Sequence, residues 1–277
     1  MTPIRPMSRA ELEMVLDWAA AEGWNPGRSD AACFHAADPD GFLLAEHGGR
    51  PVAAIAAVRG GEGQGFIGLY IAVPGARGQG HGMAAWRAGM ARLEGRCIGL
   101  DGVVAQQANY RRSGFAFAWN NARYQASAPR LPAVGHRTEP ARFDDALAAF
   151  DAAHCGHQRP AFLRAWLDAP GHVALVTRDA TGALTGFGAL RPCREGSKLG
   201  PLFARGPEEA RALFGALAAR RPPGPLVLDV PEDHAAAVAL AQEAGMAKVF
   251  ETARMYTGPP PAMRRQGIFG ITSFELG

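Results

Sequence analysis

The chain has 277 residues, of which 48% are hydrophobic and 20% are charged. This is the profile of a globular protein with room for two domains. No apolar run approaches the roughly 18 residues of a membrane span, and the N-terminal segment carries acidic residues instead of an apolar core. We therefore expect no membrane association and a cytoplasmic location.

The charges and cysteines exclude further classes. The formal net charge is +3, and all but Lys198 and Lys248 of the 29 basic residues are arginines. No basic run is interleaved with aromatic residues, so we expect no nucleic-acid partner. The four cysteines are scattered without a C-x-x-C spacing, which argues against a disulfide framework. His154, Cys155 and His157 lie close together, but no carboxylate completes a ligand set, and we expect no metal site.

In chain order, the apolar periodicity of the first half predicts a helix, an antiparallel hairpin, a third strand, a helix, a strand, a helix and a final strand. The expected bounds are Arg9 to Glu22, Gly41 to Val58, Gly65 to Val73, Met83 to Glu94, Cys97 to Asp101, Ala105 to Ser113 and Phe115 to Tyr124.

A glycine-rich loop follows the third strand in the segment 71–82, IAVPGARGQGHG. Arg77, Gly80 and Gly82 form the pattern R-x-x-G-x-G, and glycine at these points lets a phosphate approach backbone N–H groups. The helix that follows directs its free amides at the same anion. The segment predicts a phosphate-binding loop, and the alternative is a surface turn in a glycine-rich chain.

The ends of the two halves resemble each other. Leu100-Asp101 matches Leu228-Asp229, and Ala122-Arg123 matches Ala253-Arg254. A glycine precedes the arginine by nine residues in both halves (123 − 114 and 254 − 245). A pair of short apolar runs around a glycine turn also occurs upstream in each half. The sequence therefore predicts two copies of one α/β fold with a mixed sheet.

The copies define the expected domains. The first occupies residues 1–128, the second 137–277, and residues 129–136 form a linker within a proline-bearing polar stretch. After the proline run 259–261, the tail IFGITSFELG predicts one last strand added to a sheet edge.

The second copy differs at the glycine-rich loop, where it has LGPLFARGPEEARALF. The loop is shorter, and Glu208 and Glu209 occupy the first helical turn. Carboxylates there complement the helix dipole and would repel a pyrophosphate. We expect this copy to bind no cofactor.

Three motifs in this order resemble the GCN5-related N-acetyltransferases, the GNAT family. They are the strand that ends at Val73-Pro74, the loop 77–82, and the segment from Tyr110 to Phe115, YRRSGF. The segments EGWNPG and LDGVVAQQANY and the ending SFELG are similar to a bacterial two-domain GNAT subgroup of undefined substrate. The resemblance implies tandem GNAT-like domains, each a twisted, mostly antiparallel sheet with helices on both faces.

The resemblance further implies that acetyl-coenzyme A binds to the first copy. Its diphosphate would lie on the loop amides, its pantetheine arm along the third strand, and its thioester oxygen near a strand amide close to Val73. His81 is expected to be an exposed loop residue beside the phosphates. The implied cofactor-binding residues are Ile71, Ala72, Val73, Arg77, Gly78, Gln79, Gly80, His81, Gly82, Gln106, Asn109 and Tyr110.

Tyr110 falls where the family has its general acid, which would protonate the departing thiolate. The alternative is a half-buried helix tyrosine. Many family members have an asparagine about seven residues before this tyrosine, whereas this chain has Val103, so Gln106 or Asn109 would replace it. Asp101, at a strand end, is a candidate general base, and a residue that caps the following loop is the other interpretation.

The acceptor pocket is expected after the first helix. Trp24, Asn25 and Asp30 lie there, and together with Tyr70 they are the candidate acceptor-binding residues. An indole and a carboxylate could receive an ammonium group. A turn with Trp24 anchored in the core is the alternative.

These residues support an enzyme that transfers an acetyl group from acetyl-coenzyme A to a primary amine of a small molecule by direct attack. A non-catalytic acyl-coenzyme A sensor is the alternative. A dinucleotide-binding domain is disfavoured, because Met83 stands at the third glycine position of that fingerprint. The identity of the amine, a contribution of the second copy to the pocket, and homodimer formation are left open.

Overall fold

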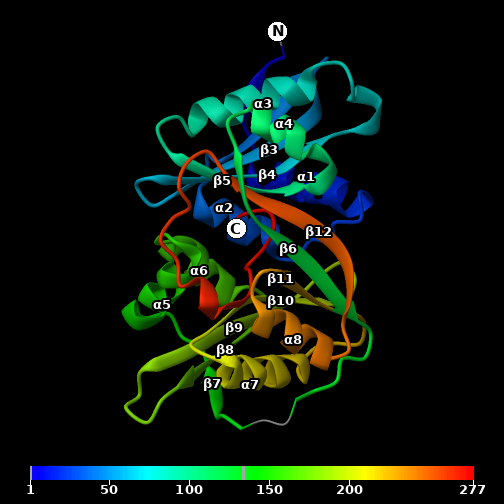
Figure 1. Ribbon diagram of the computed structural model, residues 1–277. Coiled ribbons are helices and arrows are strands. Elements are labelled where there is room, and N and C mark those ends of the chain that lie inside the picture. Colours follow the sequence, from blue (N-terminus) through cyan, green and yellow to red (C-terminus); the bar gives the residue numbers. More distant parts are fainter. Residues whose placement is uncertain (1, 133–134) are drawn as a thin grey trace.

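The computed structural model describes residues 2–132 and 135–277, which form an α/β fold around one 13-stranded sheet (Figure 1). Residues 133–134 of the predicted linker lie outside the described residues. The first repeat contributes β1 (Ile4–Pro6), α1 (Arg9–Ala21), α2 (Asp30–Ala37), β2 (Phe42–His47), β3 (Arg50–Gly60), β4 (Gln64–Ala72), α3 (His81–Arg92), β5 (Cys97–Val103), α4 (Gln107–Arg112) and β6 (Ala116–Ala126).

The second repeat follows the same order. Its elements are β7 (Thr138–Pro140), α5 (Asp145–Cys155), α6 (Pro160–Asp168), β8 (Val173–Arg178), β9 (Leu184–Pro192), β10 (Ser197–Ala204), α7 (Pro207–Ala218), β11 (Leu226–Pro231), α8 (Ala235–Glu243) and β12 (Ala247–Tyr256), followed by the tail strand β13 (Ile268–Gly270). The predicted mixed sheet is confirmed: β4–β5 and β10–β11 are parallel pairs, and the other described pairs are antiparallel.

The sheets of the two repeats are continuous because the repeats exchange their last strands. The strand order is β1-β2-β3-β4-β5-β12-β6-β11-β10-β9-β8-β7. β12 of the second repeat thus lies beside β5 of the first, and β6 of the first lies beside β11 of the second (Figure 1). β6 and β12 therefore each pair with a strand of the other repeat.

Two reciprocal ion pairs fix the exchanged strands. The register places Asp229 opposite Arg123, and Asp101 opposite Arg254. Arg123 donates to the Asp229 carboxylate over 2.7 and 2.8 Å, and Arg254 to that of Asp101 over 2.8 and 2.6 Å. Burial alone would raise the pKa of Asp229, but the Arg123 guanidinium lowers it below its usual value. The repeated Leu-Asp and Ala-Arg dipeptides of the sequence are therefore the two halves of these pairs.

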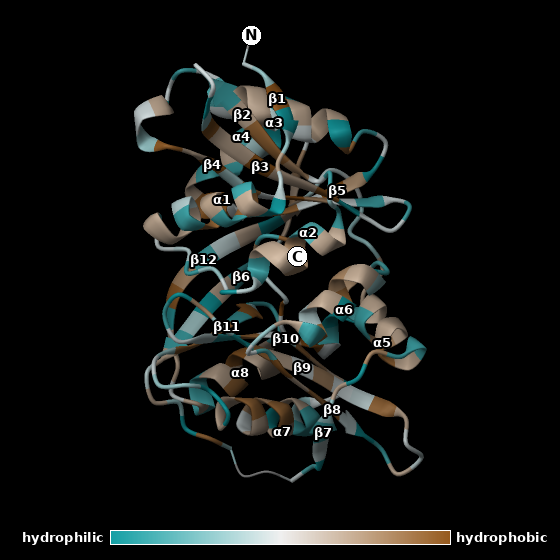
Figure 2. Cartoon of the chain, turned by 180° about the vertical axis from the view of Figure 1, so that it is seen from behind, coloured by the Kyte–Doolittle hydropathy of each residue, from teal (hydrophilic) through white to brown (hydrophobic). Residues whose placement is uncertain are grey.

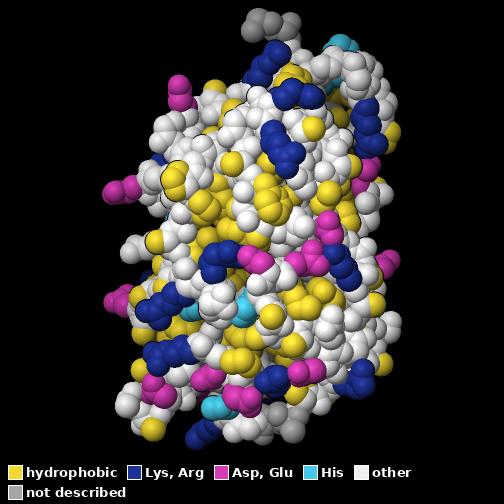
Figure 3. Space-filling view, in the orientation of Figure 1, with side chains coloured by type: hydrophobic (Ala, Val, Ile, Leu, Met, Phe, Trp, Pro, Cys, Tyr) yellow, Lys and Arg dark blue, Asp and Glu magenta, His cyan; other side chains and the backbone are white. Residues whose placement is uncertain are grey.

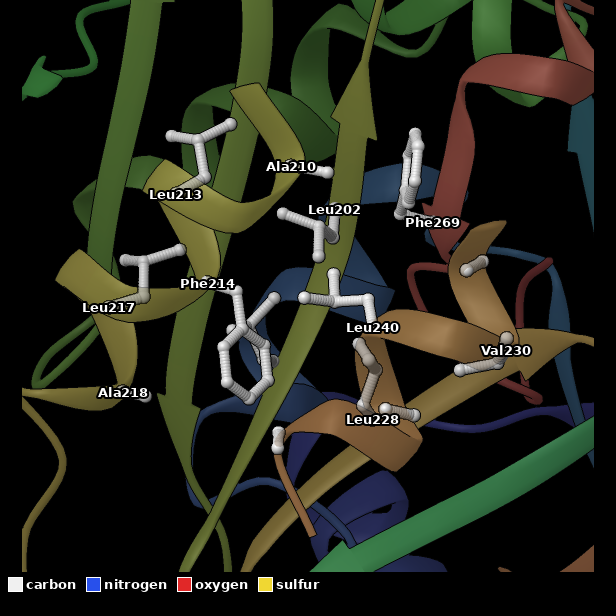
Figure 4. Close-up of a cluster of buried hydrophobic side chains, with 14 of the residues drawn as sticks. Leu202, Ala210, Leu213, Phe214, Leu217, Ala218, Leu228, Val230, Leu240 and Phe269 are labelled. Atoms are coloured by element: carbon white, nitrogen blue, oxygen red, sulfur yellow. The ribbon is translucent and has the colours of Figure 1, made fainter. Parts of the chain in front are cut away.

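Helices cover both faces of the sheet. α1 begins with a capping box in which the Ser8 Oγ accepts from the Glu11 N–H and the Glu11 carboxylate accepts from the Ser8 N–H. α2, which the sequence analysis missed, packs with α1 and, across the repeats, with α6 (Figure 2). In the second repeat, α7 and α8 bury leucine and phenylalanine side chains against β10 and β11 (Figure 4).

The sequence analysis expected the tail to add a strand at a sheet edge, and this prediction is wrong. β13 pairs with β10 at Leu202 and Phe203, and the Ile271 N–H donates to the Asp229 carbonyl of β11 over 2.9 Å. The tail therefore lies between two strands that diverge inside the sheet. Within the described residues, no helix is both long and apolar enough to cross a membrane.

Candidate active site

The site begins where β4 and β5 separate. Their parallel pairing ends at Ile67 and Leu100, and Gly68 follows. Leu69 has a positive φ of 44°, and the register between β3 and β4 shifts here, so the strand bulges. Beyond this point the β5-facing edge of β4 lines a cavity of about 450 Å³. Its other walls come from the α1–α2 loop, α4, the exchanged strands and the C-terminal tail.

The predicted phosphate loop joins β4 to α3. Gly78 and Gly80 have φ of 75° and 86°, a left-handed conformation that glycine adopts without strain. Gly80 is the N-cap of α3. Because glycine has no side chain, it cannot cap the first N–H groups of that helix. Gln79 Nε2 donates to the Gly75 carbonyl over 2.8 Å, and this bond stiffens the loop. The geometry suits an anion that approaches the backbone.

Arg77 fastens the loop to β4 and α1. Its Nε donates to the Ala72 carbonyl over 3.0 Å, and its guanidinium forms an ion pair with Glu22. Both side chains are about one-third or more exposed. The pair therefore lies at the rim of the cavity, where an anionic ligand could reach the guanidinium.

The imidazole of His81 corrects one expectation. The ring is buried, with only 6% of the residue exposed, and its Nδ1 lies 3.0 Å from the Thr2 hydroxyl. It packs on His47 with ring centroids 4.8 Å apart. His81 is thus no exposed loop residue, and only its backbone at the start of α3 remains available to a phosphate.

Tyr110 lies beside the open edge of β4. Its ring packs on Trp86 with centroids 5.7 Å apart and lies so close to Gly102 that a Cβ there would be 2.2 Å from the ring. Tyr70 also packs on Trp86, with ring centroids 5.3 Å apart. Burial raises the pKa of Tyr110, and Tyr70 raises it further. The phenol therefore stays protonated at neutral pH, as a proton donor must.

The backbone of β4 refines the expected oxyanion contact. The Val73 N–H donates to the Val52 carbonyl over 3.0 Å, so it is not free. Successive N–H groups of a strand alternate between its two edges. The N–H groups of Ile71 and Val73 consequently face β3, and the Ala72 N–H faces the open edge of β4.

Asp101 and Asp30 have structural roles. Asp101 is held by Arg254 and also accepts from Asn121 Nδ2 over 2.7 Å, and its side chain is fully buried. Asp30 does not line the cavity. It is 1% exposed, pairs with Arg191 at 3.1 Å, and accepts from the Gly27 N–H over 2.7 Å. Asp101, expected as a base, and Asp30, expected as an acceptor ligand, are thus both engaged in buried ion pairs.

Trp24 and Asn25 do line the cavity, as does Tyr70. The Trp24 carbonyl accepts from Arg123 Nη1 over 3.2 Å and from Lys198 Nζ over 3.0 Å. The Asn25 side chain donates to the Glu195 carbonyl and accepts from its N–H, both over 2.9 Å. Residues of both repeats thus hold the α1–α2 loop in place.

Gln106 and Asn109 lie outside the cavity. Both are exposed, and Asn109 donates to Gln106 and accepts from Arg112. The structure therefore brings neither amide into the cavity.

The corresponding position in the second repeat is closed. The β10–β11 pairing ends at Leu199 and Leu228, Gly200 follows, and β13 fills the space beyond. The cavity left there, beside Phe203 and Ile271, has only about 20 Å³. β10 leads to α7 through a two-residue loop, and Glu208 and Glu209 lie in the first turn of that helix, as predicted.

His154 and Cys155 line that small cavity. Nδ1 of His154 lies 2.7 Å from the Phe150 carbonyl, and its ring stacks on Phe203 with centroids 5.0 Å apart. Burial lowers the pKa of His154 below its usual value. These contacts give the imidazole a packing role.

Sequence reasoning missed the contributions of the exchanged strand and the tail. Val249 and Phe250 of β12, and Phe274 and Glu275 of the tail, all line the cavity. The segment SFELG did mark the tail as a family feature, but its pattern gave no position in space.

Gly68→Ala is expected to displace the tail from β4. A Cβ at residue 68 would lie 2.1 Å from the Glu275 carbonyl oxygen, which is backbone and cannot rotate away. Overpacking of this kind costs about 1–3 kcal/mol. We expect a lower free energy of unfolding in urea and reduced activity. Gly63→Ala is the matched control, because a Cβ there meets nothing within 4 Å. Equal stability of the two variants would contradict the tail contact.

The repeated α/β fold, with its parallel strands β4 and β5 separating halfway along, is that of an acyltransferase class. The Acetyltransferase (GNAT) family description matches residues 10–115, and the Acetyltransferase (GNAT) domain description matches residues 147–270. The chain therefore belongs to the GNAT family as a tandem member, and it is an acyltransferase.

Particular relatives agree. The chain is 30% identical over 280 residues to the holothin acyltransferase of Pseudoalteromonas sp. (strain SANK 73390), covering 99% of this chain and 94% of the relative. A putative acetyltransferase from Pyrococcus horikoshii has a similar structure, with TM-score 0.85 and 21% identity over 100% of this chain and 96% of that one. A tandem GNAT protein from the clavulanic acid biosynthesis pathway has TM-score 0.64 and 17% identity over 94% and 100%. These two likenesses concern the fold.

Proposed function

We propose that the protein transfers an acetyl group from acetyl-coenzyme A to a primary amine of a small molecule. The observation that carries this proposal is the juxtaposition, in one cavity, of the open β4 edge and the protonated phenol of Tyr110. The cavity continues past them to Trp24 and the second repeat, which leaves room for an acceptor beside the donor.

The residues present fit the acyl donor. The amides of the loop 78–82 and the start of α3 would hold its diphosphate. The Ala72 N–H would face the thioester oxygen, a contact of a kind worth about 2.7–4 kcal/mol in other enzymes. Arg87, Arg111 and Arg112 are exposed on α3 and α4, and basic side chains occur over this upper part of the molecule in Figure 3. Their charge favours an anionic ligand.

We propose direct attack by the amine on the bound thioester. An acyl-enzyme route requires a nucleophile such as a cysteine thiol. None of the four cysteines of the chain lines the cavity beside β4, and burial raises the pKa values of all four. A thiol with a raised pKa is a poor nucleophile.

We further propose that the second repeat binds no acyl donor. Its strand edge is occupied by β13, and its first helical turn carries two glutamates. Instead, the second repeat completes the first site. Asp229 holds Arg123, Lys198 holds the Trp24 carbonyl, and residues of β12 and the tail line the cavity.

A transfer assay tests the proposal against the sensor alternative. Wild-type protein with acetyl-coenzyme A is mixed with methylamine, propylamine, 2-phenylethylamine or holothin, the acceptor in the name of the relative. Release of free thiol together with an acetylated product supports the enzyme. Binding of acetyl-coenzyme A in calorimetry with no transfer to any amine of the panel supports the sensor.

A further inference from the structure

The C-terminal tail enters the acceptor end of the cavity in a fixed conformation. It passes both points at which the parallel strands separate: a Cβ at Gly200 would lie 2.6 Å from the Ile271 carbonyl oxygen, and one at Gly68 would lie 2.1 Å from that of Glu275. The Leu276 N–H donates to the Ser273 Oγ over 3.1 Å, and the Leu276 side chain is buried with α1 and α2. Contacts with β4, β10 and the α1–α2 core therefore hold the tail in place at the cavity.

Four carboxylate residues line the cavity, and one of them stands apart. Glu22 is paired with Arg77, and Asp101 with Arg254. Glu195 is exposed at the rim. Glu275 is only 6% exposed, yet among the described residues its carboxylate has no hydrogen-bond or ion-pair partner. A buried carboxylate without a partner is costly, and a cationic ligand would relieve the cost.

The charged neighbours of Glu275 are engaged elsewhere. Arg123, Arg191 and Lys198 are near enough to be influenced by its charge. The two guanidinium groups are paired with Asp229 and Asp30, respectively, and Lys198 Nζ donates to the Trp24 carbonyl. Asp229 has the same negative charge as Glu275, but its ion pair with Arg123 neutralises it. The charge of Lys198 acts on Glu275 only at longer range, and among the described residues no cation lies within ion-pair distance of the Glu275 carboxylate.

The walls around this carboxylate are apolar and aromatic. Phe250 and Phe274 have ring centroids 6.2 Å apart, and Arg123 lies over the Phe274 ring at 4.8 Å. Phe250 is 39% exposed and its neighbour Val249 55%, although both are large apolar residues at the cavity. Trp24 faces the same space. One exposed and two half-buried aromatic side chains thus line the same cavity as the buried Glu275, a combination typical of a ligand site.

We propose that Glu275 receives the amino group of the acceptor and takes its proton, and that the acceptor is a primary amine with an apolar ring, held by Trp24, Phe250 and Phe274. This inference rests on the proposed function. The ammonium gives one proton to Glu275, and its nitrogen forms a bond to the acyl carbon. The C–S bond breaks, its electron pair goes to sulfur, and Tyr110 protonates the thiolate. The amide nitrogen returns a proton to the Tyr110 oxygen, and Glu275 releases its proton to solvent.

Glu275→Gln tests the assignment with 2-phenylethylamine as acceptor. Loss of a general base typically lowers the rate by about 10²–10⁴-fold, and we expect kcat/KM to fall by that factor. Without the carboxylate the acceptor must arrive as the neutral amine, so the rate of the variant should depend on the fraction of free amine and keep rising with pH. Glu275→Asp should retain part of the rate, because the carboxylate is kept. Glu13→Gln is the control, since Glu13 is exposed on α1 and has no described partner.

Calorimetry with coenzyme A shows whether the variant is intact. Unchanged coenzyme A affinity with lost transfer supports the inference, and equal kcat/KM and pH profile for Glu275→Gln and the wild type would overturn it. The preference for an acceptor with an apolar ring is tested by comparing kcat/KM for 2-phenylethylamine and for propylamine. The two values should differ by at least about tenfold in the wild type and should become similar in Phe250→Ala. No preference in the wild type would overturn the acceptor class. If the wild type acetylates no amine, the proposed function itself fails.

Discussion

Replacement of Tyr110 with phenylalanine is expected to lower kcat by about 10²–10⁴-fold, the usual contribution of a general acid. The phenyl ring would keep its packing on Trp86 and its place against Gly102, so the cavity should keep its shape. Only the proton donor is lost, and coenzyme A affinity should not change. Steady-state kinetics with the best amine and calorimetry with coenzyme A measure both quantities.

Tyr124→Phe is the matched control for Tyr110. Tyr124 is buried in the hydrophobic core of the second repeat, away from the cavity lining, and its loss of a hydroxyl should leave kcat within about twofold. A Tyr110→Phe variant with wild-type kcat would show that the thiolate leaves without help from this phenol. The half-buried helix tyrosine of the alternative interpretation would then be correct.

Replacement of Arg254 with methionine is expected to destabilise the fold by about 3–5 kcal/mol, because it leaves the Asp101 carboxylate buried without its cation. The two side chains are 6% and 0% exposed, and they join β12 of one repeat to β5 of the other. Urea denaturation measures the free energy of unfolding. Replacing Asp101 as well, in the Arg254→Met/Asp101→Leu variant, should recover much of the loss, since no unpaired charge remains.

An exposed pair provides the comparison for Arg254. Arg265 and Asp233 form an ion pair whose side chains are 37% and 47% exposed, and such pairs contribute about 0–1 kcal/mol. Arg265→Met should therefore change stability little. If Arg254→Met were equally mild, the reciprocal ion pairs could not be what fixes the exchanged strands.

Local features of the first repeat could be predicted from sequence. The loop glycines, the strand before them, the helix after them and Tyr110 lie within some forty residues of each other, and each leaves a pattern of its own. The shorter loop and the two glutamates of α7 were predicted for the same reason. The start of α3 at His81, two residues before the predicted one, is within the usual uncertainty of helix ends.

The exchange of β6 and β12 could not be predicted, because both strands have the same pattern and either could complete either sheet. The sequence contained the Asp and Arg dipeptides but not their partners. Asp101 thus looked like a free strand-end carboxylate until its register with Arg254 was known. Likewise, nothing in SFELG indicates that Glu275 reaches a cavity of the first repeat, because that contact spans some two hundred residues.

We predict that one site, in the first repeat, serves the whole chain. Calorimetric titration with acetyl-coenzyme A tests it through the stoichiometry, with two glycine variants in parallel. Gly80→Val and Gly182→Val place the same strain at φ of 86° and 85°, the first in the phosphate loop and the second in the β8–β9 turn. We predict one molecule bound per chain, with binding lost in Gly80→Val and retained in Gly182→Val. Two molecules per chain, or full binding by Gly80→Val, would contradict a single binding site at the loop of the first repeat.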